Sequence, residues 1–219
     1  MPKACDQENR VSLTRTGTGR YAGRVEDEGN GTEPCAMAAA MLAAALDLSG
    51  PDVSPVSITT YLMADLHPGP CEVSVKWVRG NGSLQCWQAE LRQEFAVASS
   101  QILLTSDLPS SSYLPLVSDG VSAGACNTQV AVSSPYADVA RALGVSSRDL
   151  MGEDCALGSV AIRFHEDIED IGGAQAVSSL AIEYDVPRSC GEVLTCDVRL
   201  IGPSGLAAAA TYAFLRSQR

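Results

Sequence analysis

One segment of this 219-residue chain returns 120 positions later, and no other sequence feature constrains the fold as much. The stretch 33–37, Glu-Pro-Cys-Ala-Met, comes back as 153–157, Glu-Asp-Cys-Ala-Leu. Further along, Asp65 returns in the same register as Asp185. A period of this length is too long for a solenoid, whose units span ~20–50 residues, but it suits two small folding units. We therefore expect a pseudo-two-fold architecture, with any functional site at or near the seam between the copies.

The segment between the copies has the composition of a linker. Residues 106–135 are rich in Ser, Gly and Pro, and they include the runs Ser110-Ser111-Ser112 and Ser133-Ser134-Pro135. Such clusters separate folding units rather than form them. The sequence therefore predicts a first repeat over 1–105, a linker over 106–135 and a second repeat over 136–219.

The charge balance excludes one class of partner. The formal net charge is −11, with 15 Lys and Arg against 26 Asp and Glu. Nucleic-acid binding that is independent of sequence needs a Lys and Arg footprint, so we expect no nucleic-acid partner. The same charge gives no long-range attraction for coenzyme A or an acidic carrier protein, although a local basic patch could still serve them.

No segment has the character of a membrane span or a signal peptide. The longest apolar segment, 35–48, is fourteen residues long and carries only Asp47 as a charged residue. A membrane-spanning helix needs ~20 apolar residues. The stretch 1–7, Met-Pro-Lys-Ala-Cys-Asp-Gln, lacks the apolar core of a signal peptide. We therefore expect a soluble cytoplasmic protein that has no membrane partner.

The eight cysteines form no pattern of a metal site or a disulfide framework. There is no Cys-x-x-Cys, and the only histidines are His67 and His165. Zinc sites use clustered Cys and His at short spacings, and disulfides are rare without secretion. Cys35 and Cys155 would sit in a first helical turn, where a nucleophile would also want a neighbouring base. We predict buried packing thiols, no metal site and no cofactor.

The first copy reads as strands, a buried helix and then more strands. Residues 11–26 alternate loosely and predict one or two short strands. The helix runs from about Pro34 to Leu48, is apolar on all sides, and must therefore be covered on all sides. The β-type segments that follow are 56–66, 71–78, 85–90 and 95–104. An antiparallel sheet that wraps around the helix satisfies this requirement.

The second copy repeats this order in a more polar form. On the register of the repeat, a helix begins at about Asp154, and strands follow near 177–186, 191–200 and 206–215. The predicted helix carries Arg163 and His165, so it would be less enclosed than the first one. This difference indicates asymmetry between the copies, with chemistry supplied mainly by the second half.

The order of these elements resembles that of a known family. The segments 57–62 and 68–75 resemble the strand, Pro-rich turn and Val/Glu-rich strand that follow the helix in acyl-CoA thioesterase-like proteins. The segments 95–101 and 206–214 look like the closing strands of the two halves. The whole is similar to the double hot-dog fold, an α+β architecture in which each of two repeats wraps an antiparallel sheet around a central helix. The resemblance implies an acyl thioester substrate in an apolar tunnel between helix and sheet.

The chain departs from this family at the catalytic positions. The family commonly has a glycine pair at the start of the first helix, where this chain has Glu33-Pro34-Cys35, and proline has no N–H to donate. In type II thioesterases the second half supplies an Asp, a Thr or Ser, and a Gln. On the alignment these positions fall at Glu153-Asp154, at 177–179 and near Tyr212. The Gln is thus replaced.

Five residues become candidates for hydrolysis. A carboxylate at a helix start is stabilised by the helix dipole and free N–H groups, so Glu33 and Glu153 can be helix caps. They can equally act as a general base, and Asp154 adds a second carboxylate beside Glu153. Ser178 or Ser179 would assist in the position of the family's Thr or Ser.

The remaining candidates are a histidine and four polar side chains. In dehydratase-type hot-dog enzymes a His paired with a carboxylate transfers the proton, and His165 is followed by Glu166 and Asp167. Adjacent residues on a helix do not face each other, which weakens this dyad. Four side chains on the strands are candidates for substrate binding: Gln101, Tyr212, Thr60 and Tyr184. His67 and the repeated Asp65 and Asp185 are read as residues of surface turns.

These observations leave three functions open. The first is a thioesterase-like enzyme that acts on an acyl thioester or a related carbonyl compound. The second is a hot-dog enzyme repurposed for dehydration, isomerisation or cyclisation of a polyketide-like intermediate. The third is a non-catalytic binding module. In the first two the partner is a small-molecule acyl or polyketide-like substrate, and a homodimer is plausible because hot-dog sheets often associate further.

Overall fold

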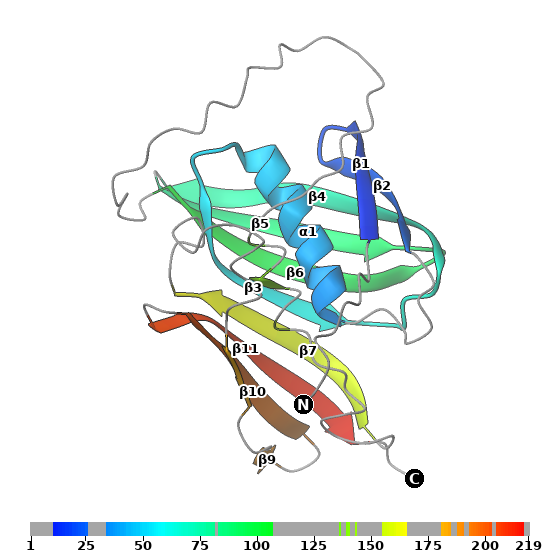
Figure 1. Ribbon diagram of the computed structural model, residues 1–219. Coiled ribbons are helices and arrows are strands. Elements are labelled where there is room, and N and C mark those ends of the chain that lie inside the picture. Colours follow the sequence, from blue (N-terminus) through cyan, green and yellow to red (C-terminus); the bar gives the residue numbers. More distant parts are fainter. Residues whose placement is uncertain are drawn as a thin grey trace.

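A single sheet of eleven strands carries the fold, and one long helix lies against it (Figure 1). The computed structural model describes residues 11–25, 34–81, 83–106, 136, 139, 140, 143, 155–165, 181–184, 188–190, 193–202 and 205–216. The elements of the first half are β1 (Val11–Gly17), β2 (Arg20–Val25), α1 (Pro34–Ser49), β3 (Ser54–Leu62), β4 (Gly69–Asn81), β5 (Leu84–Arg92) and β6 (Ala96–Thr105). Those of the second half are β7 (Cys155–Phe164), β8 (Ala181–Tyr184), β9 (Arg188–Cys190), β10 (Val193–Gly202) and β11 (Gly205–Arg216).

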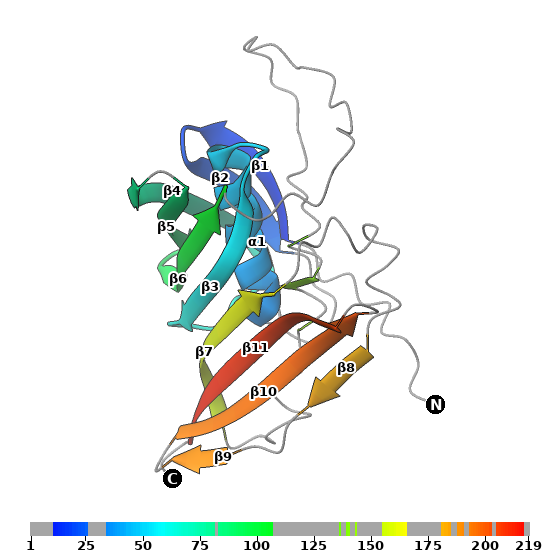
Figure 2. The same cartoon turned by 90° about the vertical axis from the view of Figure 1, so that its left-hand side faces the viewer.

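The strands of the two halves follow a corresponding order outward from one junction, β3-β6-β5-β4 in the first half and β7-β11-β10-β8 in the second. The spatial order is β1-β2-β4-β5-β6-β3-β7-β11-β10-β8, with β9 paired to β10, and every pairing is antiparallel. At the junction, 57–61 of β3 pair with 159–163 of β7. We call this β3–β7 pairing the seam. The halves therefore share one continuous sheet, and Figure 2 shows β7, β11, β10 and β8 beside one another in its second half.

Helix α1 forms because its sequence is rich in alanine, a proline favours its start and a glycine ends it. Pro34 occupies the first position, where its missing N–H costs nothing. At the other end Gly50 has φ 102° and donates its N–H to the carbonyl of Leu46 at 3.2 Å, a conformation that glycine adopts readily. Residues 35–45 are all buried. The sequence-based prediction of a helix apolar on every side is confirmed.

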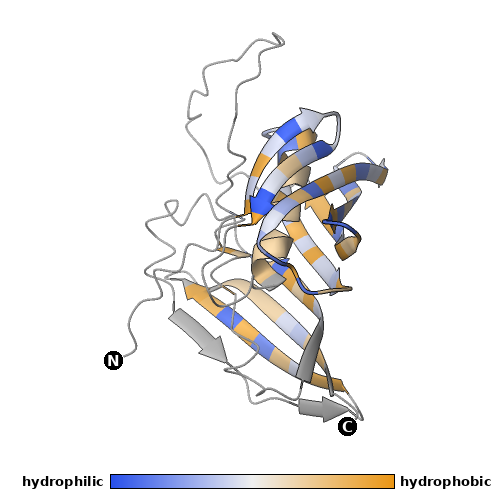
Figure 3. Ribbon diagram, turned by 90° about the vertical axis from the view of Figure 1, so that its right-hand side faces the viewer, coloured by the Kyte–Doolittle hydropathy of each residue, from blue (hydrophilic) through white to orange (hydrophobic). Residues whose placement is uncertain are grey.

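Strands β3 to β6 cover one side of α1. The β1–β2 hairpin, at the end of the same sheet, lies on the other side of the helix (Figure 1). Along the strands, apolar side chains that face the helix alternate with polar ones, as the banding in Figure 3 shows. In β4, for example, Val73 and Val75 are buried, whereas Glu72 and Ser74 are exposed. The strands expected at 11–26, 56–66, 71–78, 85–90 and 95–104 are all present, with shifts of a few residues at their ends.

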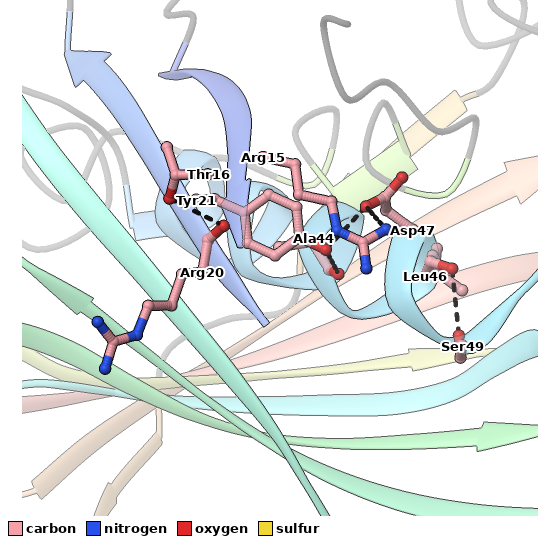
Figure 4. A network of polar contacts seen from close by, with 8 residues as sticks. All are labelled: Arg15, Thr16, Arg20, Tyr21, Ala44, Leu46, Asp47 and Ser49. Carbon is pink, nitrogen blue, oxygen red and sulfur yellow. Dashed lines mark hydrogen bonds and ion pairs between the residues drawn. The ribbon is translucent and has the colours of Figure 1, made fainter. Parts of the chain in front are cut away.

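A polar network fastens the β1–β2 hairpin to the end of α1 (Figure 4). The buried Tyr21 hydroxyl lies 3.0 Å from the Ala44 carbonyl oxygen and 2.8 Å from Oδ2 of Asp47. Arg15 approaches the same carboxylate oxygen at 3.6 Å. A carboxylate near a helix C-terminus is unfavourable, and these two contacts offset that cost. Burial, and then the Asp47 carboxylate, raise the pKa of Tyr21 well above its usual value.

Two buried hydroxyls lie between α1 and the sheet. Thr60 of β3 and Ser100 of β6 are fully buried, and their oxygens are 2.7 Å apart. Ser100 also donates to the Sδ of Met41 on α1, at 3.3 Å. Each hydroxyl thereby has a partner in an otherwise apolar layer, which is the condition under which buried polar groups are tolerated.

The predicted second helix from Asp154 is wrong. Residues 155–164 form strand β7, and β11 pairs along it. The physical reason is the period of the sequence: Val160 and Ile162 are buried, whereas Arg163 is exposed, and alternation with β-branched residues favours a strand. The match between 33–37 and 153–157 therefore joins a helix start to a strand start.

The structural repeat has a different register. Near its start, β3 has one extra residue, Val56, relative to β6, and β7 has one extra residue, Gly158, relative to β11. These two β-bulges occupy the same place in the two halves and lie 102 positions apart in the sequence. With that offset Thr59 corresponds to Ala161, and these two residues face each other directly in the seam. A pseudo-two-fold axis between them relates the halves.

Two other expectations can be placed against the fold. The strands expected at 177–186, 191–200 and 206–215 correspond to β8, β10 and β11 as far as the chain is described. The division at 105 and 135 stays a prediction, because 107–135 lies outside the described residues. Within the described part of the chain, no helix combines the length and the apolar character that a membrane crossing requires.

We expect alkaline pH to destabilise the fold through Cys71. Burial raises the pKa of this thiol from 9.0 to about 11, so its contribution to stability is complete below pH 9 and is lost as the pH rises towards 11. Linkage gives a loss of about 1 kcal/mol between pH 8 and pH 10 from this group alone. Urea unfolding at the two pH values should therefore show a smaller loss in Cys71→Ala than in the wild type. Cys86→Ala is the control, and an equal loss in wild type and Cys71→Ala would contradict the assignment.

The hydroxyl pair should behave as a coupled unit in a double-mutant cycle. Ser100→Ala leaves Thr60 without its side-chain partner and should cost about 1–3 kcal/mol of unfolding free energy, whereas Thr60→Val should cost less because Ser100 keeps its bond to Met41. The double variant removes both groups and should cost less than the sum of the single changes. Chemical denaturation of the four proteins measures this, and strict additivity would show that the 2.7 Å contact has no energetic role.

Candidate functional site

The start of α1 lies against the closing strand of the second half. The Sγ of Cys35, in the first turn of the helix, is 2.9 Å from the hydroxyl oxygen of Tyr212 on β11. The Tyr212 hydroxyl lies 2.5 Å from the carbonyl oxygen of Leu143 and donates its proton there. Both side chains are buried. Three segments far apart in the sequence thus meet at one phenol group, which we call the Tyr212 junction.

The proton positions at this junction follow from simple counting. A tyrosine hydroxyl has one proton, and the Leu143 carbonyl can only accept it. The Cys35 thiol is therefore the donor in its contact with Tyr212. The sequence-based interpretation of Cys35 as a buried thiol is confirmed. Its contact with Tyr212 had no sequence signal, because the two residues are 177 positions apart.

Leu143 follows three helical residues that the sequence repeat missed. Tyr136, Val139 and Ala140 are helical and buried, and the Leu143 N–H donates to the Val139 carbonyl at 3.1 Å. Their spacing of three, four and seven residues places them on one helical face. This periodic pattern was the available signal. Tyr136 packs edge-to-face against Phe164 at 5.7 Å and donates to Oγ of Ser54 at 3.1 Å, so this stretch contacts both halves.

The two halves do not offer equivalent sites. The structural register relates Tyr212 on β11 to Ile102 on β6, an apolar residue. It likewise relates the Thr60–Ser100 pair to Ile162 and Ala210. The first half thus places its buried hydroxyls under the middle of α1, and the second half places its hydroxyl at the start of α1. The two halves therefore differ in both directions: each half carries a polar group at a position where the other half is apolar.

Several predicted residues lie away from this junction. His165 follows β7, is exposed, and donates its backbone N–H to the Ala207 carbonyl at 2.9 Å. His67 is exposed in the turn before β4, as its interpretation as a surface turn required, and Asp65 is exposed as well. Gln101 is exposed on the face of β6 that points away from α1. It therefore cannot reach a tunnel between helix and sheet, since neighbouring strand residues face opposite sides.

Thr60 and Tyr212 are the two predicted substrate-binding residues that reach the helix side of the sheet. Tyr184 is placed in β8, but its side chain lies outside the described residues. The proposed bases and assisting hydroxyls lie wholly outside the described residues: Glu33, Glu153, Asp154, Ser178 and Ser179. The structure therefore leaves these assignments as predictions.

The Tyr212 junction has the elements of a site for a carbonyl group. The first N–H groups of any helix have no partner within the helix, and the helix dipole makes that end attractive to developing negative charge. At α1 these groups include the N–H of Ala36 and Met37, which lie next to Cys35. Tyr212 adds a hydroxyl held in place by Leu143. Among the residues described, no cluster of His, Cys, Asp or Glu could hold a metal ion.

One known family matches part of the first half. Residues 35–105 match the family described as the acyl-CoA thioesterase N-terminal domain. The match begins at the first turn of α1 and ends with β6, so it covers the helix and strands β3 to β6 but not the β1–β2 hairpin. No protein of curated function matches the chain.

Solved structures match almost the whole chain. The tesB protein of Mycobacterium avium subsp. paratuberculosis is 17% identical, with a TM-score of 0.67 over 94% of this chain and 96% of that one. The acyl-CoA thioesterase II TesB2 of Mycobacterium marinum is 14% identical, with a TM-score of 0.67 over 95% and 96%. A conserved protein with a hot-dog fold from Alicyclobacillus acidocaldarius is 14% identical, with a TM-score of 0.66 over 97% and 98%. At these identities the structures establish the fold. The chain is therefore an α+β protein with the double hot-dog fold, and its residues 35–105 are similar to the acyl-CoA thioesterase N-terminal domain family.

Proposed function

We propose that this protein acts on an acyl thioester or a related carbonyl compound, with the acyl group lying in an apolar tunnel beside α1. The observation that carries the proposal is the Tyr212 junction, where a helix start of the thioesterase-like half meets a buried hydroxyl of the other half. Cys35, Thr60 and Ser100 are the other polar side chains that the described core presents near this path. The proposal places a single site in each chain.

In this proposal the substrate carbonyl binds at the first turn of α1. The N–H groups of Ala36 and Met37 would stabilise the negative charge that develops on the carbonyl oxygen as a thioester is attacked. Pro34 cannot contribute, so the donors lie one or two residues further into the helix than in the glycine-pair pattern. Tyr212 would be a third donor once substrate displaces its bond to Leu143.

Hydrolysis also needs a base that activates water. The candidates remain the carboxylates of Glu153, Asp154 and Glu33, with Ser178 or Ser179 as an assisting hydroxyl. Exposed His165 is a weaker candidate, since an exposed side chain would have to turn inward to reach the start of α1. An active-site carboxylate would take a proton from water as the water oxygen attacks the thioester carbon. The C–S bond would then break, and the carboxyl group would return the proton to the departing thiolate, giving a free thiol and a carboxylic acid.

One observation favours the second candidate function. Tyr212 stands near the position where the type II thioesterases have a Gln, and a phenol can deliver a proton, whereas an amide cannot. A buried phenol beside an apolar tunnel therefore also suits dehydration, isomerisation or cyclisation of a polyketide-like intermediate. A chain that binds such compounds without turnover would be the third candidate, a binding module.

A thiol-release assay with acyl-CoA thioesters from short to long chains separates these functions. We expect turnover above the uncatalysed background for at least one chain length. If no chain is hydrolysed, calorimetry with the same thioesters decides the rest: binding without release would leave the dehydratase-type or binding-module function, and no binding would remove the acyl thioester as a substrate.

Tyr212→Phe should lower kcat on the best substrate about 10²-fold, as expected for the loss of one donor at a developing oxyanion. KM should change much less, because the phenol is engaged mainly in the transition state. Tyr61→Phe is the matched control, since Tyr61 is 52% exposed on the opposite face of the sheet. Thermal unfolding of both variants separates a catalytic loss from a folding defect. Unchanged kcat in Tyr212→Phe would remove Tyr212 from the mechanism.

Substitution of the candidate bases tests the rest of the assignment. Glu153→Gln, Asp154→Asn and Glu33→Gln remove one carboxylate each with little change in size. We expect one of the three to lower kcat by 10²-fold or more, about the contribution of a general base. The control is Asp52→Asn, an exposed residue in the turn after α1. Full activity in all three variants and in His165→Ala would show that none of these groups is the base.

A further inference from the structure

A pocket lies in the first half of the molecule. It is at the end of the sheet where β3 leads into β4 and β5 into β6, and Figure 1 shows the course of these strands. Its volume is about 620 Å³, which is within the range of small-molecule sites. Strand β2, the turn 67–70 and the turn 92–95 form its walls. No residue of the Tyr212 junction lines it, so it is a separate feature from the proposed acyl site.

One side chain holds the two turns of this pocket together. The amide of Gln93 accepts the N–H of His67 at 3.1 Å and donates to the carbonyl oxygen of the same residue at 2.7 Å. It also donates to the Pro70 carbonyl at 3.4 Å. Because three hydrogen bonds fix this amide to the opposite turn, the pocket has a defined shape before any ligand arrives.

The walls of the pocket are largely apolar. Pro68, Pro70 and Ala22 line it, and the buried Cys71 thiol forms part of its inner surface. The ring of Phe95 also lines the pocket and is 53% exposed, which is unusual for a phenylalanine. A ligand with an apolar or aromatic body would cover this ring and recover the burial that the free protein lacks.

The charged side chains around the pocket favour a positively charged ligand. Glu72 and Glu94 line it, and neither forms an ion pair within the described part of the chain. The lining guanidinium of Arg92 lies 3.2 Å from Glu90 in an exposed ion pair, and Arg92 is also the cross-strand neighbour of Glu72. The carboxylates therefore outweigh the one cation, and the net charge of −11 steers cations towards the protein. A cation can also rest on the face of the Phe95 ring.

We propose that this pocket binds an organic cation with an apolar body, such as an aryl-alkyl ammonium compound. The ammonium group lies between the Glu72 and Glu94 carboxylates, and the body packs against Phe95 and the two prolines. Gln93 is a positioning residue that keeps the turns in place. The assignment does not depend on the acyl thioester proposal, because the two sites share no residue.

Three probes of similar size and different charge test the assignment: 2-phenylethylammonium, 2-phenylethanol and phenylacetate. Each is titrated into the full ¹⁵N-labelled chain, and the amide resonances are followed by NMR. We expect saturable shifts at His67, Gln93 and Phe95 with the cation, and an affinity at least about tenfold higher than for the alcohol, as for one charge contact. Phenylacetate should bind more weakly still.

Variants decide which groups carry the binding. Glu94→Gln and Glu72→Gln should each weaken cation binding about three- to tenfold, and Phe95→Leu, which keeps an apolar side chain but removes the ring, about two- to fivefold. Asp52→Asn removes an equal charge from an exposed turn outside the pocket and should change the affinity less than twofold. Equal affinity for cation and alcohol, shifts outside the pocket, or no saturable shifts with the cation would each overturn the proposal. The amide NMR spectrum of each variant, recorded without ligand, shows whether the variant is folded.

Discussion

The pairing of β3 with β7 is the constraint on which the rest of the molecule depends. Five residue pairs join 57–61 to 159–163 and make one sheet out of two halves. This pairing alone brings β11 beside the start of α1, so that Cys35 and Tyr212 can touch. The bulges at Val56 and Gly158 fix the register on both sides of the seam, since a slip of one residue would turn Ile58 and Ile162 away from the core.

The duplication preserved the backbone and let the polar groups diverge. In the structural register Tyr212 is equivalent to Ile102, and Thr60 is equivalent to Ile162. A buried hydroxyl is costly unless it is bonded, so each surviving hydroxyl has kept a partner: Leu143 for Tyr212, and Ser100 for Thr60. In a homodimer of two identical halves, each half would have to carry both the tyrosine hydroxyl and the Thr–Ser pair. Fusion into one chain permits each half to specialise.

The sequence predicted the parts of the fold that depend on local pattern. The wholly apolar helix from Pro34 and the alternation in β4 were sufficient for the first half, because both signals lie within one segment. The second half was misread because a five-residue match at 153–157 outweighed the alternation that runs through Val160 and Ile162. At the site, Tyr212 could be named from the family resemblance. Its contacts with Cys35 and Leu143 could not, since they depend on long-range pairing that no local pattern encodes.

The seam also has a consequence for synthesis of the chain. When β6 has left the ribosome, β3 still has an unpaired edge towards the missing β7, and unpaired edges promote association between chains. The ribosome needs about 3–10 s to add the roughly fifty residues that separate β6 from β7. During that interval the first half is a nascent intermediate with an open strand and a helix start that lacks its cover. Chaperone dependence and expression yield should therefore respond to the length and translation speed of the segment between the halves.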